Sequence, residues 1–214
     1  MIVDLPKNNL HAGLKKLPEK FYERYVLDVA PDLLGKIFVR KTGDTYLSGK
    51  IVETEAYDGA IDEAAHSYNG RTERNAVMFD GSGLLYVYFT YGMHYCANVV
   101  TGKKGHGQAV LLRGIEPLSG IERMSFNRFG NKTPGEKQRL NLTNGPAKIC
   151  QAFGMTKAQN GTNLTGNEIF ILDLPLPGSS KIITTKRIGI KKSVDLPWRY
   201  YIEGNAYVSK PVTK

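Results

Sequence analysis

The sequence is poor in the residues that build metal centres and disulfide frameworks. Its 214 residues include two cysteines, Cys96 and Cys150, and four histidines. Two isolated cysteines in a chain of this length do not form a disulfide framework, and they favour a reducing compartment. The histidines, at positions 11, 66, 94 and 106, lack the spacing of zinc ligands. We therefore expect no metal site.

Long hydrophobic runs without polar residues are also missing. Residues 81–102 contain no Asp, Glu, Lys or Arg and are long enough to raise the question of a membrane span. They include several tyrosines, His94 and Asn98, a polar load that a lipid-facing helix does not carry without partners. Residues 1–10 contain charges and Pro6 where a signal peptide needs an apolar core. We expect a soluble protein.

Acidic residues are scarce relative to basic ones. The chain has 20 Asp and Glu against 29 Lys and Arg, a formal net charge of +9, which suggests an anionic partner such as nucleic acid or an anionic membrane surface. Residues 50–80 are the exception, with seven acids against three bases, a net charge of −4 that leaves +13 on the rest. This pattern suggests a polyanion-binding protein whose carboxylates do something other than binding.

The hydrophobic pattern predicts an α+β fold with more strands than helices. Strands are predicted at 36–41, 47–56, 84–100, 108–115, 169–172, 182–190 and 198–202. Helices are predicted at 26–35, with Pro31 near its first turn and Gly35 as its stop, at 116–129 and at 146–153. Hairpins outnumber crossovers, which favours a mainly antiparallel sheet. One domain over residues 17–214 is expected, preceded by a flexible segment 1–16, with two small domains as the alternative.

The stretch from Ile51 to Tyr57 places two carboxylates close together. On a strand, Glu53, Glu55 and Tyr57 lie on one face, because side chains alternate between faces. Seen alone, this pattern is more often a solvated strand face. The functional alternative is a carboxylate that acts as a base and activates water.

A long polar loop, residues 58–79, follows this strand and contains the segment Asp62–Ser67 with His66. Long ordered loops in compact domains are often functional. A lone loop histidine, however, is more often a surface residue than a functional one. The loop alone leaves both interpretations of His66 open.

The segment 85–98 is predicted to form a hairpin with bulky residues at its tip. A three-residue loop, Tyr91-Gly92-Met93, would pair Tyr86 with Asn98 and place both on one face. The simplest interpretation is an amphipathic strand with tyrosines at its rim. Large apolar groups at a turn, however, are typical of a wedge for a partner, and such wedges unstack DNA bases.

Seven stretches in this order resemble the alkyladenine (3-methyladenine) DNA glycosylase family. Several separate matches in register, spanning roughly residues 17–208, make the resemblance specific. The stretches are Gly49–Tyr57 (GKIVETEAY), Asp62–Ser67 (DEAAHS), Arg71–Phe79 (RTERNAVMF), Leu85–Asn98, Val110–Pro117 (VLLRGIEP), Gly145–Ala152 (GPAKICQA) and Arg187–Gly189 (RIG).

The resemblance implies a role for each matching residue. Glu55 corresponds to the general base that activates the attacking water, and Arg113 lines the site near that water. The aromatic walls of the base pocket correspond to Tyr57, His66 and Tyr88. Asn98 corresponds to the side chain that rejects guanine through its exocyclic amine. Tyr91, with Met93 beside it, corresponds to the residue that fills the gap left in the duplex.

The resemblance also implies the fold and the reaction. The fold is a single domain with a curved, mainly antiparallel sheet, surrounding helices and a protruding hairpin that inserts into DNA. The reaction is removal of alkylated or deaminated purines from double-stranded DNA by a monofunctional hydrolase, as the first step of base excision repair. No cofactor, metal or membrane is implied, and we expect a monomer inside the cell, with the DNA. Glu53 matches the family without a role that we would assign, and it is taken as structural.

Two other functions remain possible at this stage. A non-catalytic protein could use the finger and the basic surface to recognise damaged DNA, but binding alone gains nothing from a carboxylate near phosphates. A carbohydrate-active hydrolase could use Glu53 and Glu55, but the positive charge and the turn-tip aromatics give it little support. Excision of a lesion from an oligonucleotide separates these possibilities.

Overall fold

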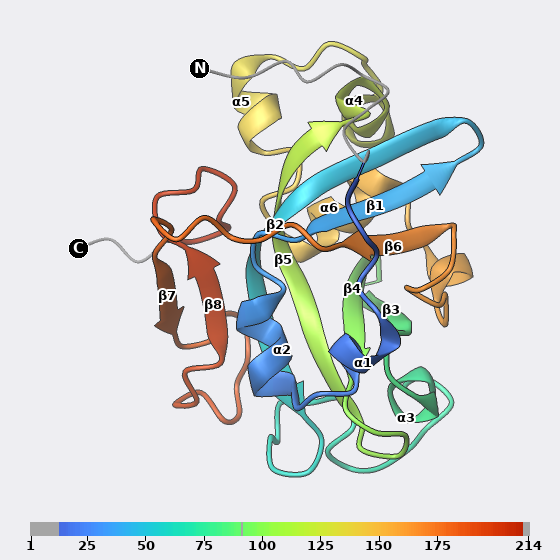
Figure 1. Ribbon diagram of the computed structural model, residues 1–214, viewed down its shortest axis with the longest axis vertical. Coiled ribbons are helices and arrows are strands. Elements are labelled where there is room, and N and C mark those ends of the chain that lie inside the picture. The colour runs from blue at the N-terminus through green and yellow to red at the C-terminus, as the bar shows by residue number, and fades with distance from the viewer. Residues whose placement is uncertain (1–12, 91, 212–214) are drawn as a thin grey trace.

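The computed structural model describes residues 13–90 and 92–211. Short helices surround eight strands (Figure 1). In chain order the elements are α1 (Glu19–Tyr22), α2 (Val26–Asp32), β1 (Ile37–Thr42), β2 (Thr45–Asp58), α3 (Val77–Asp80), β3 (Leu85–Thr90), β4 (His94–Thr101), β5 (Gln108–Ser119), α4 (Ile121–Phe129), α5 (Glu136–Leu140), α6 (Pro146–Phe153), the 3-10 turn η1 (Lys157–Gln159), β6 (Ile169–Leu172), β7 (Ile182–Thr185) and β8 (Arg199–Ile202).

All strands pair antiparallel in one curved sheet. The order is β3-β4-β5-β2-β1-β6, and β8 pairs with both β2 and β7. The long strand β2 makes this possible, because residues 45–50 pair with β1 and residues 53–55 pair with β8. Figure 1 shows the β1–β2 hairpin and the β7–β8 hairpin extending to opposite sides. The α+β class and the mainly antiparallel sheet are confirmed.

One face of the sheet carries the hydrophobic core. Thr54 of β2 points to this face, where its hydroxyl donates to the Ala30 carbonyl of α2 at 2.9 Å. Leu85, Val99 and Leu112 of β3, β4 and β5 belong to the same buried cluster as the helices. Since side chains alternate along each strand, the opposite face of these strands is free to line a site.

The predicted hairpin register is confirmed. Tyr86 lies opposite Asn98 and Thr90 lies opposite His94. The turn between β3 and β4 therefore spans three residues, and Gly92 within it has a positive φ of 66°. Tyr91 lies outside the described residues.

Two predicted boundaries, and the predicted place of Pro31 within its helix, are wrong. The strand β5 continues to Ser119, where the sequence predicts a helix from residue 116, because its pairing with β2 continues to the Ser48–Ser119 pair. Helix α4 begins only after Gly120, whose φ is 72°. The strand predicted at 182–190 ends at Thr185, and Pro31 lies in the last turn of α2 rather than the first.

Residues 15–17 meet the far edge of the sheet. The Leu17 amide donates to the Ile171 carbonyl of β6 at 2.8 Å, and the Asp173 amide donates to the Lys15 carbonyl at 2.8 Å. The earlier part of the segment that was predicted to be flexible, residues 1–12, lies outside the described residues. In the described part of the chain, no helix is both long enough and apolar enough to cross a membrane.

Candidate active site

A cleft of about 550 Å³ opens on the sheet face opposite the core. Its floor consists of alternate side chains from four neighbouring strands, namely Tyr57 of β2, Tyr86, Tyr88 and Thr90 of β3, Cys96 and Asn98 of β4, and Ala109, Leu111 and Arg113 of β5. Its walls come from the loop after β2, from α3, from the first residue of α6, and from the β7–β8 loop. Along each of these strands, alternate side chains therefore point to the core and to the cleft.

The carboxylate of Glu55 lies immediately behind the cleft wall. The side chain is fully buried, and its three partners, Tyr57, Arg113 and Ile188, all line the cleft. The Tyr57 hydroxyl donates to Oε2 at 2.9 Å, Nη1 of Arg113 to Oε2 at 3.2 Å, and the Ile188 amide to Oε1 at 2.7 Å. A carboxylate accepts about four hydrogen bonds, so Glu55 keeps capacity for about one more.

Glu53 is equally buried but has no spare capacity. Its Oε1 accepts from Nε of Arg113 at 3.1 Å, Nε of Arg199 at 2.7 Å and Oγ of Ser209 at 2.9 Å. Its Oε2 accepts from the Ser209 amide at 2.6 Å. The interpretation of this strand face as solvated is wrong, because both carboxylates have 0% exposure. Long-range pairing with arginines offsets the cost of burying them.

His66 and two tyrosines form an aromatic wall. The His66 ring meets Tyr88 edge-on, with centroids 4.5 Å apart, and Tyr88 stacks beside Tyr86 at 5.5 Å. Nδ1 of His66 lies 3.1 Å from the Tyr86 hydroxyl. Desolvation, and secondarily the Arg74 charge, lower the pKa of His66 from 6.5. The imidazole is therefore neutral at pH 7.

Tyr57 lines the cleft and contacts Glu55 through its hydroxyl, and its ring is supported by a buried cation. The guanidinium carbon of Arg187 lies 4.6 Å from the Tyr57 ring centroid. Arg187 is held in turn by Asp62, with Nη1–Oδ2 and Nη2–Oδ1 distances of 2.5 and 2.8 Å. Desolvation and the nearby Glu55 carboxylate raise the pKa of Tyr57, so its hydroxyl keeps the proton that it donates to Glu55.

Asn98 lies on the floor of the cleft. Its Nδ2 donates to the Tyr86 carbonyl at 3.2 Å across the β3–β4 ladder, which fixes the direction of the amide. Its side chain lines the same cleft as Tyr57, His66, Tyr88 and Arg113. The structure thus brings together all the predicted pocket residues and Arg113, with Glu55 directly behind them.

The tip of the β3–β4 hairpin presents apolar side chains to solvent. Met93 is 69% exposed and Phe89 is 49% exposed. Near the end of β3, the Phe89 carbonyl accepts a hydrogen bond from Nη2 of Arg74 at 3.1 Å. Met93 therefore protrudes, as a wedge would require; Tyr91, its predicted companion, is not among the described residues.

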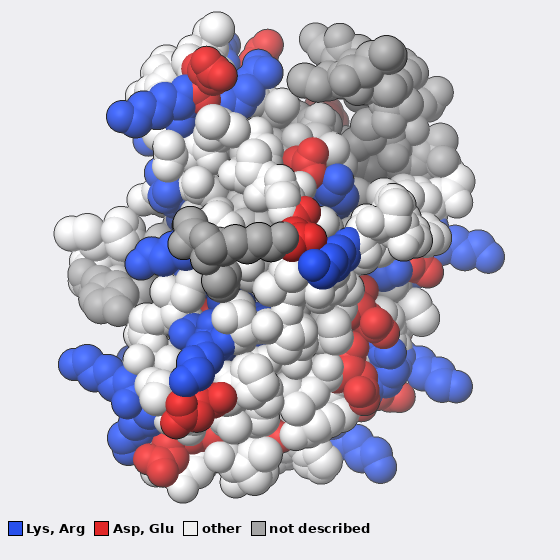
Figure 2. Space-filling model, turned by 90° about the vertical axis from the view of Figure 1, so that its left-hand side faces the viewer, with Lys and Arg blue, Asp and Glu red and all other residues white. Residues whose placement is uncertain are grey.

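Residues 181–192 contain five basic side chains and no acidic one, and most of these basic side chains form ion pairs with acidic residues elsewhere. Lys181 pairs with Glu203, Lys186 with Asp195 and Lys192 with Glu63. Figure 2, which views the side carrying β7 and β8, accordingly shows Lys and Arg interspersed with Asp and Glu. Lys191 is exposed and lines the cleft.

Sequence reasoning missed the residues that hold the site together. Asp62 and Arg187 lie 125 positions apart, and Glu53 lies 146 positions from Arg199. Arg187 begins one of the matching stretches without a role assigned to it, and Arg199 lies in a predicted strand that reads as ordinary, so only their burial indicates what they do. Among the residues that the structure describes, no group of three or more His, Cys, Asp or Glu side chains is arranged to hold a metal ion.

Comparison with known proteins points to one family. The family described as Methylpurine-DNA glycosylase (MPG) matches residues 20–206. A relative from Burkholderia lata is 48% identical over 200 residues, covering 92% of this chain and 93% of its own length. Relatives from Alkaliphilus oremlandii and Desulfitobacterium hafniense are each 46% identical and cover 91% and 92% of this chain and 99% of their own. All three carry the name "Putative 3-methyladenine DNA glycosylase".

Proposed function

Because this chain belongs to the methylpurine-DNA glycosylase family, we propose that it excises damaged purines from duplex DNA with a water activated by Glu55. It is a hydrolytic DNA glycosylase of the 3-methyladenine type. The proposed substrates are alkylated and deaminated purines, of the class that includes 3-methyladenine, 7-methylguanine, hypoxanthine and ethenoadenine. Excision starts base excision repair.

The observation that carries the proposal is the partly filled hydrogen-bonding shell of Glu55 behind an aromatic cleft. Tyr57, Arg113 and the Ile188 amide fix the carboxylate from three directions. The remaining acceptor site can hold a water. A base that is oriented but not saturated suits general-base catalysis, whereas the saturated Glu53 does not.

The reaction follows from this placement. The water oxygen attacks the sugar C1′, its proton passes to Glu55, and the C1′–N bond breaks with the electron pair leaving on the purine. The transition state resembles an oxocarbenium ion, so the Glu55 carboxylate also stabilises the positive charge on the sugar. No lysine stands in a matching motif as a Schiff-base nucleophile. We therefore propose a monofunctional enzyme that leaves an abasic site.

The cleft supports a flipped base. A base stacked in a duplex hides its glycosidic bond, and turning it out costs a few kcal/mol. Stacking on Tyr57, His66 and Tyr88 returns roughly 1–3 kcal/mol per base. A neutral His66 does not repel a purine that alkylation has made cationic, and the tyrosine faces attract it. In this proposal Tyr91, assisted by Met93, fills the gap that the flipped nucleotide leaves.

The proposed partner is double-stranded DNA containing a damaged purine. We propose that the protein acts as a monomer, inside the cell and with the DNA. No cofactor takes part in the proposed reaction.

The test is excision from duplexes that each carry one damaged purine, with abasic sites detected by strand cleavage. We expect Glu55→Gln to bind lesion DNA like the wild type and to lose excision by about 10²–10⁴-fold, the usual contribution of a general base. Glu168→Gln, which changes an exposed carboxylate just before β6, is the matched control and should excise normally. Wild-type excision by Glu55→Gln would contradict the mechanism. Binding without excision by the wild type would instead indicate a non-catalytic damage sensor.

A further inference from the structure

We propose that Glu53 is a positioning residue for excision, which acts with the C-terminal segment 205–210 to hold the Arg113 guanidinium against Glu55. The proposal rests on the function proposed above. It assigns to Glu53 a task that differs from that of Glu55, although both carboxylates lie on the same face of β2.

Four donors converge on the Glu53 carboxylate. They are Nε of Arg113 and Nε of Arg199, with the amide and the hydroxyl of Ser209, at distances between 2.6 and 3.1 Å. This saturates the carboxylate. A saturated, fully buried carboxylate cannot take a substrate or a water, but it can fix the groups that bind it.

Arg113 is the group that Glu53 fixes. Its Nε donates to Glu53, its Nη1 donates to Glu55 at 3.2 Å, and its Nη2 donates to Oγ of Ser209 at 3.3 Å. The guanidinium is planar and presents its donors in a rigid fork. Contacts on three sides therefore determine where Nη1 lies relative to Glu55. Without Glu53, the guanidinium plane of Arg113 can rotate away from Glu55.

The backbone is shaped around this contact. Pairing between β2 and β5 is irregular on both sides of Glu53, which lies opposite Gly114. Bulges of this kind re-aim side chains and are common beside active sites. A Cβ on Gly114 would lie 2.6 Å from the Tyr207 carbonyl oxygen. Only glycine at that position lets the C-terminal segment pass directly over the strand that carries Arg113.

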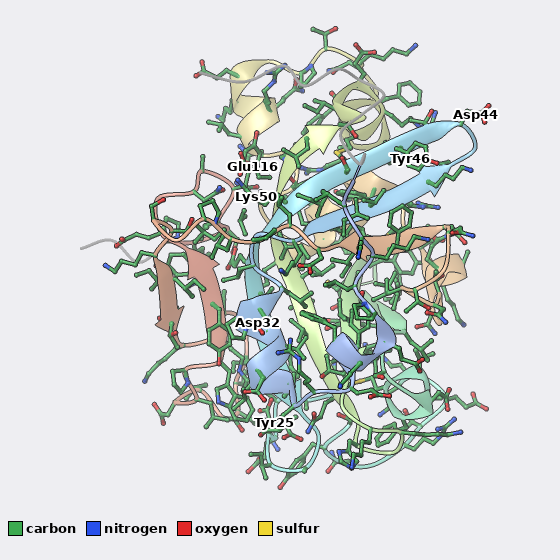
Figure 3. The ribbon with its side chains drawn as sticks, in the orientation of Figure 1. Tyr25, Asp32, Asp44, Tyr46, Lys50 and Glu116 are labelled. Atoms are coloured by element: carbon green, nitrogen blue, oxygen red, sulfur yellow. The ribbon has the colours of Figure 1, made fainter. Side chains whose placement is uncertain are left out.

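The C-terminal segment is anchored on both sides of this crossing. At one end, Nδ2 of Asn205 donates to Glu116 at 2.9 Å. Glu116 also pairs with Lys50 at 2.8 Å, and both lie where β2 meets β5 (Figure 3). At the other end, Nη2 of Arg199 donates to the Lys210 carbonyl at 2.5 Å. Ser209 is thereby held in reach of Glu53 and Arg113.

The charges of this cluster balance only when Glu53 is present. Glu53 and Glu55 face Arg113 and Arg199, while Arg187, another buried arginine, is already paired with Asp62. Removing one carboxylate leaves two buried guanidinium groups competing for Glu55, and an unbalanced buried charge is strongly unfavourable. The competition would pull Glu55 away from the water that it must activate.

The alternative is that Glu53 only anchors the C-terminal segment. The two roles separate in single-turnover excision with enzyme in saturating excess, because the rate constant then does not depend on the fraction of folded enzyme. Glu53→Gln keeps the shape but replaces one acceptor oxygen with an amide that faces four donors. If Glu53 positions Arg113, the rate constant falls by about 10²-fold, while the affinity for lesion DNA stays within about twofold. If it is only an anchor, the folded fraction falls and the rate constant is unchanged, which overturns the proposal.

Two further variants keep the outcome decisive. Asp173→Asn removes the exposed carboxylate that pairs with Lys36 beyond β6 and should excise at the wild-type rate. Ser209→Ala leaves all four charges in place and removes the hydroxyl shared by Glu53 and Arg113, so it tests the same geometry if Glu53→Gln fails to fold. We expect Ser209→Ala to have a severalfold lower rate constant than the wild type. If Glu53→Gln fails to fold, an unchanged rate constant for Ser209→Ala would overturn the proposal. Absence of excision by the wild type would refute the proposed function itself, whereas normal excision by both site variants refutes only this inference.

Discussion

At the scale of single residues, the number of hydrogen bonds that a buried group already makes decides what it can still do. Glu55 accepts three bonds and faces the cleft side of the sheet, while Glu53 accepts four and faces Arg199 and Ser209. The same residue type, two positions apart on one strand, thus keeps capacity for a further hydrogen bond in one case and not in the other. The same count applies to Asn98, whose amide donates to the Tyr86 carbonyl and leaves its remaining polar capacity toward the cleft.

The direction of the Asn98 side chain predicts its effect on base selection. Asn98→Ala removes the group that is proposed to meet the exocyclic amine of guanine. We expect excision of undamaged guanine, relative to damaged adenine, to rise by about tenfold, since small steric differences in a pocket are worth about 10–200-fold. The measurement is competitive excision from mixed duplexes. Asn160→Ala, which removes the acceptor for the Val87 amide away from the cleft, is the control; equal ratios in both variants would contradict the role of Asn98.

His66 predicts a pH dependence of stability. Desolvation and the Arg74 charge lower the pKa of His66 in the folded protein below 6.5, so the unfolded chain takes up the proton first as the pH falls. Stability is then constant above about pH 6.5 and decreases as the pH falls from there to the lower folded-state pKa. We expect His66→Gln to lose less stability than the wild type between pH 7.5 and 5.5, measured by denaturant unfolding. Parallel curves for the two proteins would rule out His66 as the source.

Single residues are predictable from the sequence where their contacts lie close in the chain, and not where their contacts come from distant positions. The shared face of Glu53, Glu55 and Tyr57 follows from strand alternation and is confirmed. The burial of Glu53 does not follow, because it depends on Arg199 and Ser209, which lie 146 and 156 positions away. No local pattern links such residues. Glu53 therefore read as a structural residue without a partner.

At the scale of elements, two loops are joined across one wall of the cleft. Asp62, in the loop after β2, binds Arg187, which follows β7, and both side chains are fully buried. Nη1 of Arg187 also donates to the Ala56 carbonyl at 3.0 Å, and Nη2 donates to the Ser193 carbonyl at 3.3 Å. The Glu63 amide donates to Oγ of Ser193 at 3.1 Å. The ion pair thus sets the position of both the Tyr57 ring and the loop that carries Ile188.

This ion pair predicts a large stability difference between two carboxylate variants. Asp62→Asn leaves the Arg187 charge buried without its partner, and breaking such a pair costs about 3–5 kcal/mol. Glu203→Gln breaks the exposed Lys181 pair and should cost at most about 1 kcal/mol. Denaturant unfolding measures both. A loss of about 1 kcal/mol or less for Asp62→Asn would show that the pair does not hold the wall.

The elements themselves were predictable to the extent that their ends are set locally. The β3–β4 register follows from the length of the loop between them, and helix α6 begins at Pro146 and ends before Gly154, as its sequence indicates. The end of β5 was not predictable in this way. Its residues 116–119 look helical in sequence, yet they pair with β2 as far as Ser48. A partner strand some seventy positions away decides their conformation.

At the scale of the whole molecule, the net charge of +9 is less informative than the way in which it is divided. The acid-rich residues 50–80 include Glu55, the proposed general base, together with one half of the buried Asp62–Arg187 pair and the surface partners of Arg71 and Lys192. Several surface cations are therefore paired, and Figure 2 shows Lys and Arg interspersed with Asp and Glu on one side of the molecule. Affinity for the DNA backbone should depend on the few cations that lie at the mouth of the cleft.

Lys191 is the cation that tests this expectation. It is exposed and lines the cleft, so a flipped nucleotide would bring its phosphates near the ammonium group. Each phosphate contact contributes about 0.9 to the slope of log K against log salt concentration for duplex DNA. We expect Lys191→Gln to weaken binding to damaged and undamaged duplexes alike and to reduce that slope by about 0.9, measured by fluorescence anisotropy over a salt series. Lys20→Gln, on α1 at the core side of the sheet, is the matched control with the same change in net charge. Equal slopes for the two variants would show that binding depends on net charge alone, and a loss confined to damaged DNA would place Lys191 in the base pocket rather than on the backbone.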